Sequence, residues 1–152
     1  MLYEGLLRDQ SIKAFSPTSR EITALIGVAH TRIRDLGVGN FSPDVVYQLA
    51  YDAARAAAQA LMASEGYRPT GGGGQHKVIF QFLQEADEGR WAREATHYDR
   101  ARLKRNRSLY EEAGLISPDE ARWLVELTAK FVAAVEARIR AKWERRAESE
   151  QS

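Results

Sequence analysis

Apolar residues recur every three or four positions along most of the chain, which is the spacing of one face of an α-helix. The pattern predicts five helices, at about residues 18–36, 43–65, 75–86, 90–109 and 118–146. No segment alternates apolar and polar residues for long enough to indicate a β-strand. We therefore predict an all-α fold, an up-and-down bundle of about five helices, with a further helical turn at the N-terminal "LYEGLL".

The predicted helix ends rest on short local signals. Thr18 with Glu21 fits a capping box at the first helix, and two Ser-Pro pairs, Ser42-Pro43 and Ser117-Pro118, place a cap and then a proline at the first helical position. Four consecutive glycines at 71–74 predict a flexible connector, because no strand precedes them and no Gly-Lys-Ser/Thr phosphate loop follows.

Composition narrows the class of protein. The 152 residues, with 44% hydrophobic and 28% charged residues, predict one domain over residues 1–152, frayed near both termini. The net charge of +1 excludes a uniformly basic nucleic-acid coat, and the absence of cysteine excludes disulfides and thiolate zinc sites. No apolar run is long enough to span a membrane, and the start lacks the pattern of a secretory signal, so we expect a cytoplasmic protein.

Positive charge is concentrated in one predicted helix, which ends in the stretch "RLKRNRSLYEE" (residues 102–112). Residues 90–110 hold only two acids, Glu94 and Asp99, against seven cations: Arg90, Arg93, Arg100, Arg102, Lys104, Arg105 and Arg107. Cations near a helix C-terminus also complement the helix dipole, so a purely structural role explains part of this charge. The alternative is a local site for RNA or a nucleotide.

Helical spacing gives that site a geometry. Asn106 and Tyr110 are four residues apart and share a face, and the long side chain of Arg105 can bend over both. A guanidinium and an amide suit phosphate and ribose oxygens, whereas an ordinary phenol stays protonated at pH 7 and is a poor general base. The opposing interpretation is a helix-end hydrogen-bond network with Tyr110 packed in the core. The predicted RNA- or nucleotide-binding residues are Arg102, Lys104, Arg105, Asn106, Arg107 and Tyr110.

Other polar residues indicate weaker sites. His76 and His97 are too far apart for a metal pair on one helix, and no cofactor motif occurs, so we predict neither a metal nor a cofactor. His76 is expected to cap or pack at the start of its helix. The three tryptophans are expected at helix ends or in a dimer interface, and the basic C-terminal helix end is expected to be a solvated face.

The stretches "VVYQLAYDAARAAAQALMASEGYRPTGGGGQHKVIF" and "RLKRNRSLYEE" together resemble the HEPN superfamily, small all-α bundles of prokaryotic toxin–antitoxin and phage-defence modules. In ribonuclease members an arginine, often followed by asparagine, precedes a histidine by four to six residues. Arg105 and Asn106 match this motif, and Tyr110 stands in place of the histidine. If the chain were active, the resemblance would make Arg105, Asn106 and Tyr110 the catalytic residues, but the missing histidine implies a branch that binds without efficient cleavage.

Three hypotheses remain open at this point. The first is an HEPN-type RNA- or nucleotide-binding component of a defence or toxin–antitoxin module. The second is an active metal-independent ribonuclease in which His97 or a histidine of a second subunit replaces the missing base. The third is a helical protein-interaction module. The resemblance also implies a homodimer and a nucleotidyltransferase-type partner, for which the phenol of Tyr110 is an alternative nucleotide acceptor.

Overall fold

The computed structural model describes residues 2–71, 73–111 and 113–151, with side chains through Arg145. It is 77% helical and confirms the all-α prediction. The described helices are α1 (Glu4–Arg8), α2 (Ser19–Val38), α3 (Pro43–Ser64), α4 (Gln75–Gly89), α5 (Ala92–Tyr110) and α6 (Pro118–Gln151). The last helix continues past its predicted end at about 146. The predicted fraying at Met1 and Ser152 lies outside the described residues.

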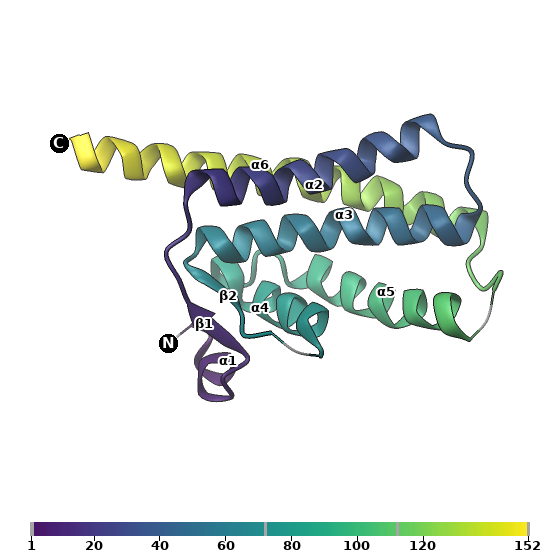
Figure 1. Cartoon of the computed structure of the whole chain (residues 1–152), viewed down its shortest axis with the longest axis horizontal. Helices are drawn as coiled ribbons and strands as arrows, with labels where there is room; N and C mark the ends of the chain where they lie inside the picture. The colour runs from purple at the N-terminus through teal and green to yellow at the C-terminus, as the bar shows by residue number, and fades with distance from the viewer. Residues whose placement is uncertain (1, 72, 112, 152) are drawn as a thin grey trace.

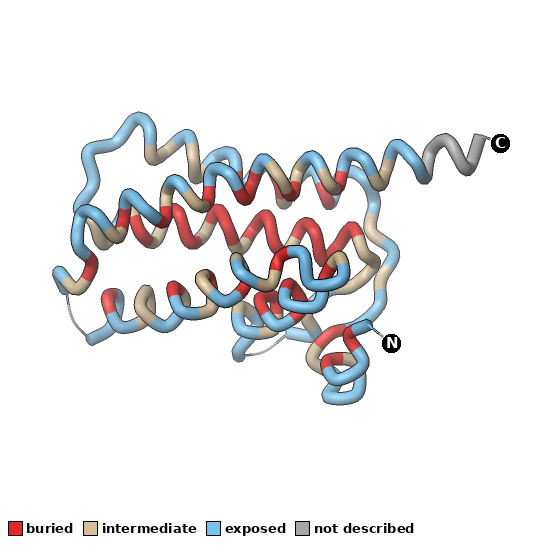
Figure 2. The backbone as a smooth tube through the Cα atoms, turned by 180° about the vertical axis from the view of Figure 1, so that it is seen from behind, coloured by how far each residue is buried: buried red, intermediate tan, exposed pale blue. Residues whose placement is uncertain are grey.

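Helix α3 is the centre of the bundle. It contacts α2 and α6 on one side and α4 and α5 on the other, so the long helices form three layers (Figure 1). More than half of the residues of α3 are buried (Figure 2), and most of the buried ones are alanines. Small side chains let neighbouring helices approach closely, which explains how one helix packs against four others.

Local capping fixes where the long helices begin. The hydroxyl of Thr18 accepts a hydrogen bond from the Glu21 amide, and the Glu21 side chain accepts one from the Thr18 amide. Ser42 caps α3 and Ser117 caps the first turn of α6 in the same way, with N–O distances of 3.4 and 3.1 Å. These caps satisfy amides that the helix itself leaves unpaired, and they confirm the predicted starts.

The structure corrects the prediction that the chain lacks strands. β1 (Ile12–Ala14) pairs antiparallel with β2 (Tyr67–Pro69), with Ile12 opposite Pro69 and Ala14 opposite Tyr67. Each strand has three residues, which is too short for an alternating pattern to be recognised. This antiparallel pair of strands fastens the N-terminal segment to the end of α3.

The N-terminal segment packs against α4. The Tyr3 ring stacks on Phe82 with centroids 4.0 Å apart, and the backbone amide of Tyr3 donates to Glu85. Leu6 of α1 is buried beside them. The short helix expected at the start of the chain is therefore present and is part of the core.

The connection between α4 and α5 is held by a buried carboxylate. Asp87 lies where α4 loses helical geometry, with a φ of 52°, and accepts hydrogen bonds from Trp91 Nε1 at 2.8 Å and from Arg138 Nη2 of α6 at 2.9 Å. The helical part of α4 thus ends near Ala86, as the sequence predicted. Asp87 therefore fastens the connection between α4 and α5 to Arg138 of α6, which lies 51 residues further along the chain.

A second carboxylate ties the turn between α5 and α6 to the start of α3. Asp44 accepts hydrogen bonds from the backbone amides of Gly114 at 2.8 Å and Ile116 at 3.3 Å. The hydrogen bond from Gly114 holds the pKa of Asp44 below its ordinary value. The ionised form is therefore the one that fastens this turn.

Replacing Asp44 with alanine is expected to lower the free energy of unfolding by about 1–2 kcal/mol, because two amides lose a charged acceptor. Because the folded-state pKa is lowered, the contribution should be present above pH 4 or so and vanish as the pH falls through the folded-state pKa. Urea unfolding at pH 7 and at acidic pH measures both effects. The control is Glu126→Ala, a change at an exposed carboxylate of α6. An equal loss of unfolding free energy in the two variants would contradict the role assigned to Asp44.

Candidate functional site

Much of the positive charge of α5 is neutralised by neighbouring acids. Lys104 pairs with Glu120 of α6, and Arg102 Nε lies 3.1 Å from Asp99 Oδ1. Arg107 is exposed and lies 3.9 Å from Glu111. These pairs support the structural explanation for part of the charge, and they leave Arg105 as the cation of the motif to explain.

Arg105 has no acidic partner among the described residues. Its guanidinium carbon lies 5.2 Å from the centre of the Tyr51 ring, and its Nη1 donates to Asn106 Oδ1 at 3.4 Å. Its Nε is buried without a hydrogen-bond partner. A cation held against an aromatic face without a carboxylate keeps its charge available for an anionic ligand.

Residues from α4 complete a polar cavity beside this motif. A space of about 360 Å³, here called the histidine hollow, is lined by Gly74, Gln75, His76, Lys77, Arg102 and Asn106. Gly74 has a φ of 84°, which allows the chain to turn from the glycine run directly into α4. The positive end of the α4 dipole therefore faces the same region as the cations of α5.

His76 is joined to the central helix. Its Nδ1 lies 3.0 Å from the hydroxyl of Tyr51, a residue that is 0% exposed. Burial and the charges of Arg55 and Arg105 lower the pKa of His76, while burial raises the pKa of Tyr51 above its ordinary range. Both side chains are therefore neutral at pH 7. His76 packs as predicted but does not cap α4, whose N-cap is Gly74.

A second polar cavity lies between α2, α3 and α5, and Arg105 lines it. This arginine hollow, of about 280 Å³, is lined by Arg32, Val45, Gln48, Leu49, Asp52 and Arg105. Asp52 accepts from Arg32 Nε at 3.0 Å and from Arg55 Nε at 3.3 Å. Burial alone would raise the pKa of Asp52, but the two arginines lower it below its ordinary value. Asp52 is thus an ionised, neutralised carboxylate and a poor proton acceptor.

The structure places Tyr110 at the exposed end of α5. Its side chain is 82% exposed, so the interpretation that packs it in the core is wrong. Arg105 lies over Tyr51, whereas the sequence predicted that it would bend over Tyr110. Asn106 and Tyr110 remain one helical turn apart, and the role of Tyr110 stays a prediction.

His97, proposed as a substitute base, lies elsewhere. Its ring packs edge-on against Trp123 of α6, with centroids 5.0 Å apart, and it lines neither hollow. His76 is the histidine that the fold brings to the motif. Sequence reasoning missed this because it searched along α5, whereas the contact joins α4 with α5.

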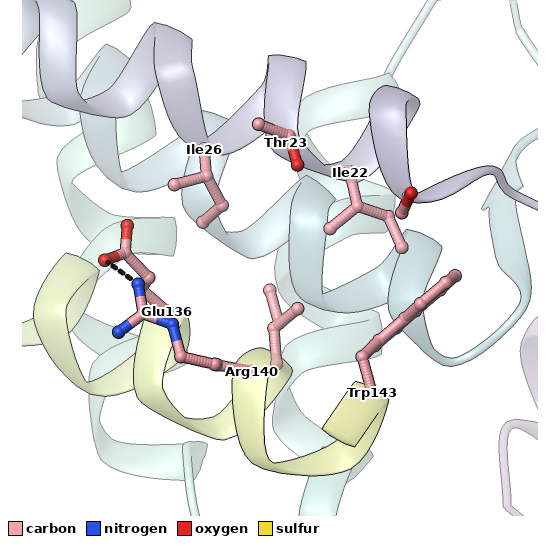
Figure 3. A pocket seen from close by; sticks show the side chains of 8 residues that line it. Ile22, Thr23, Ile26, Glu136, Arg140 and Trp143 are labelled. Carbon is pink, nitrogen blue, oxygen red and sulfur yellow. Dashed lines mark hydrogen bonds and ion pairs between the residues drawn. The ribbon is translucent and has the colours of Figure 1, made fainter. Parts of the chain in front are cut away.

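Several cations of α6 pair with acids. Arg138 binds Asp87, and Arg140 binds Glu136, which also pairs with His30 of α2. Figure 3 shows Arg140 and Trp143 beside an apolar groove of about 250 Å³ between α2 and α6, walled by Ile22 and Ile26. The side chain of His30 is 47% exposed.

Of the three tryptophans, Trp91 lies at a helix end, whereas Trp123 and Trp143 lie within α6. Trp91 is buried where α5 begins and meets Phe131 edge-on, with ring centres 5.6 Å apart. Trp123 covers His97 and Trp143 borders the groove. These contacts account for the three aromatic side chains as packing residues.

The described residues limit the kinds of site that the chain can form. They contain no group of three or more His, Cys, Asp or Glu residues that could hold a metal ion. Within the same residues, every helix is too short or too polar to cross a bilayer.

Comparison with family models, with curated proteins and with solved structures found no match to this chain.

Proposed function

We propose that the chain is an HEPN-type component of a prokaryotic toxin–antitoxin or defence module that binds RNA or a nucleotide without efficient cleavage. The proposal rests on one observation: His76, Arg102 and Asn106 line the same hollow. Arg105 lies next to them and has no acidic partner in the described structure. This arrangement fits the Arg-Asn motif that the resemblance identifies.

The chemistry of the hollows favours a phosphorylated ligand. A guanidinium can bind two phosphate oxygens at once, and an amide and an imidazole can bind others. Lys77 and the positive end of the α4 dipole add charge of the same sign. Because Arg105 is already held against Tyr51, little side-chain entropy is lost when a ligand binds.

Efficient cleavage would need a group that accepts the 2′-hydroxyl proton at pH 7. The side chain of Tyr110 is a phenol, and Asp52 is occupied by Arg32 and Arg55. The ribonuclease hypothesis stays the second candidate because His76 lies in the hollow, although its Nδ1 is already bonded to Tyr51.

The homodimer and a nucleotidyltransferase-type partner belong to the same proposal. The turns between α2 and α3 and between α5 and α6 lie at one end of the bundle, beside the arginine hollow (Figure 1). Exposed apolar residues gather in these segments: Val38, Phe41, Val45, Leu109 and Tyr110. A partner surface covering them would sit next to the motif, as the resemblance implies.

The test is salt-dependent binding of a fluorescein-labelled single-stranded RNA, followed by fluorescence anisotropy. The affinity should fall as KCl rises, because bound cations release counterions from the phosphates. Replacing Arg102 and Arg105 together by glutamine should weaken binding by about tenfold or more, as two direct phosphate contacts are lost. Competition with unlabelled mononucleotide distinguishes the two ligand classes.

The matched control removes two exposed arginines of α6, Arg122 and Arg140, which pair with acids on their own helix. Both double variants change the net charge equally, so nonspecific attraction should fall equally in each. Arg138 is unsuitable as a control because its loss would leave Asp87 unpaired. Equal loss of affinity in the two double variants would contradict the proposed site.

A further inference from the structure

The buried hydroxyl of Tyr51 determines how His76 carries its proton. Tyr51 is completely buried, and its hydroxyl has one hydrogen-bond partner in the described structure, His76 Nδ1 at 3.0 Å. A buried O–H that donates to nothing costs about 1–3 kcal/mol. Tyr51 therefore donates its hydrogen to Nδ1, since the opposite arrangement would leave that hydrogen unpaired.

This donation leaves one arrangement for the imidazole. Burial and neighbouring arginines lower the pKa of His76, so the ring is neutral at pH 7 and carries a single N–H. With Nδ1 accepting from Tyr51, that hydrogen is on Nε2. His76 thus has a donor, and no free acceptor, for a ligand.

Three of the other side chains that line the histidine hollow follow the same rule, whereas the amide of Gln75 carries both a donor and an acceptor. Lys77 and Arg102 carry only donors. Asn106 uses its Oδ1 to accept from Arg105 Nη1, which leaves its NH₂ group to donate. These groups match a ligand atom that accepts several hydrogen bonds and donates none, such as a non-bridging phosphate oxygen.

We infer that Tyr51 is a positioning residue that fixes His76 in the Nε2–H tautomer, so that the histidine hollow binds a phosphate through donors alone. The tautomer stands independently of any ligand, whereas the choice of phosphate rests on the proposed function. The same arrangement keeps His76 from accepting a proton from a ribose hydroxyl through Nε2.

Long-range ¹H–¹⁵N correlation spectra of the full ¹⁵N-labelled chain at pH 7 test the tautomer directly. His76 is expected to show Nδ1 in the shift range of an unprotonated ring nitrogen and Nε2 in that of a protonated one. His30 and His97 serve as internal references. A spectrum with Nε2 unprotonated would overturn the inference without bearing on whether RNA binds.

Tyr51→Phe tests the cause of the tautomer. The variant removes one oxygen from a buried site and should let both neutral forms of His76 appear, while the reference histidines keep their spectra. If Tyr51→Phe fails to fold, the wild-type spectrum alone still decides the tautomer. A folded variant that keeps the pure Nε2–H form would show that Tyr51 does not impose it.

Titration with inorganic phosphate tests the donor role. The Nε2–H resonance of His76 should shift on addition of phosphate, and the Arg102→Gln, Arg105→Gln double variant should lose this shift. A confirmed tautomer with no shift would overturn the phosphate assignment but not the tautomer. Loss of RNA affinity in that double variant, measured separately, reports on the proposed function.

Discussion

Replacing Asp87 with alanine is expected to lower the free energy of unfolding by about 3 kcal/mol, because breaking a largely buried ion pair leaves the other charge unpaired. The Asp87 side chain is 11% exposed and accepts hydrogen bonds from both Nε and Nη2 of Arg138 and from Trp91 Nε1. Its removal leaves a guanidinium unpaired beside the core. Alanine is also less suited than aspartate to a φ of 52°.

The pH dependence of this variant follows from the same contacts. Burial alone raises the pKa of Asp87, but the hydrogen bonds from Arg138 and Trp91 lower it below its ordinary value. Stability from Asp87 is therefore present above about pH 4 and is lost as the pH falls through the folded-state pKa. Urea unfolding across this range should show wild type and variant converging in acid.

Glu88→Ala provides the matched control for Asp87. Glu88 is exposed and has nearly the same backbone conformation, with a φ of 58°, so both changes place alanine in a left-handed position. The difference between the two variants isolates the hydrogen bonds of Asp87. Similar losses of stability would contradict the role assigned to the carboxylate.

The helices could be predicted because their signals are local. Thr18, Ser42 and Ser117 each cap a helix through atoms within three residues, so no tertiary contact is needed to place the start. The pairing of Ile12 with Pro69 joins positions 57 residues apart. That contact leaves no pattern in either strand alone.

The site could be predicted only in part for the same reason. Arg105 and Asn106 are adjacent in sequence, and their grouping follows from one helix. His76 joins these residues only because α4 packs against α5, and Tyr51 joins them only because α3 packs against both helices. One signal was available: Tyr51, Asp52 and Arg55 interrupt an alanine-rich helix, and polar groups in such a core helix need polar partners.

The unmodified chain is expected to leave labelled RNA intact at pH 7, and Tyr110→His is expected to produce cleavage. In the wild type, the nitrogen of His76 that could face a ligand carries a hydrogen, and the side chain at position 110 is a phenol. A histidine at position 110 would take the place of a tyrosine that is 82% exposed, and the hydroxyl of Tyr51, which bonds to His76, would not hold its nitrogen. It can therefore accept the 2′-hydroxyl proton.

A positioned general base contributes about 10²–10⁴-fold to such reactions, so the gain should be measurable on a sequencing gel. Cleavage by Tyr110→His should disappear when Arg105→Ala is added, because the phosphate then lacks its cation. Tyr110→Phe is the control for loss of the hydroxyl alone and should leave RNA intact. Circular dichroism of each variant establishes that the bundle is folded.

The outcomes separate the binding and ribonuclease hypotheses. Cleavage by the unmodified chain that is lost in Arg105→Ala and unchanged in Tyr110→Phe would favour the ribonuclease, with His76 as the base. In that case His76→Gln should also abolish cleavage, and the Nε2–H tautomer would have to be wrong. Cleavage confined to Tyr110→His would instead tie the lack of activity to the tyrosine at position 110.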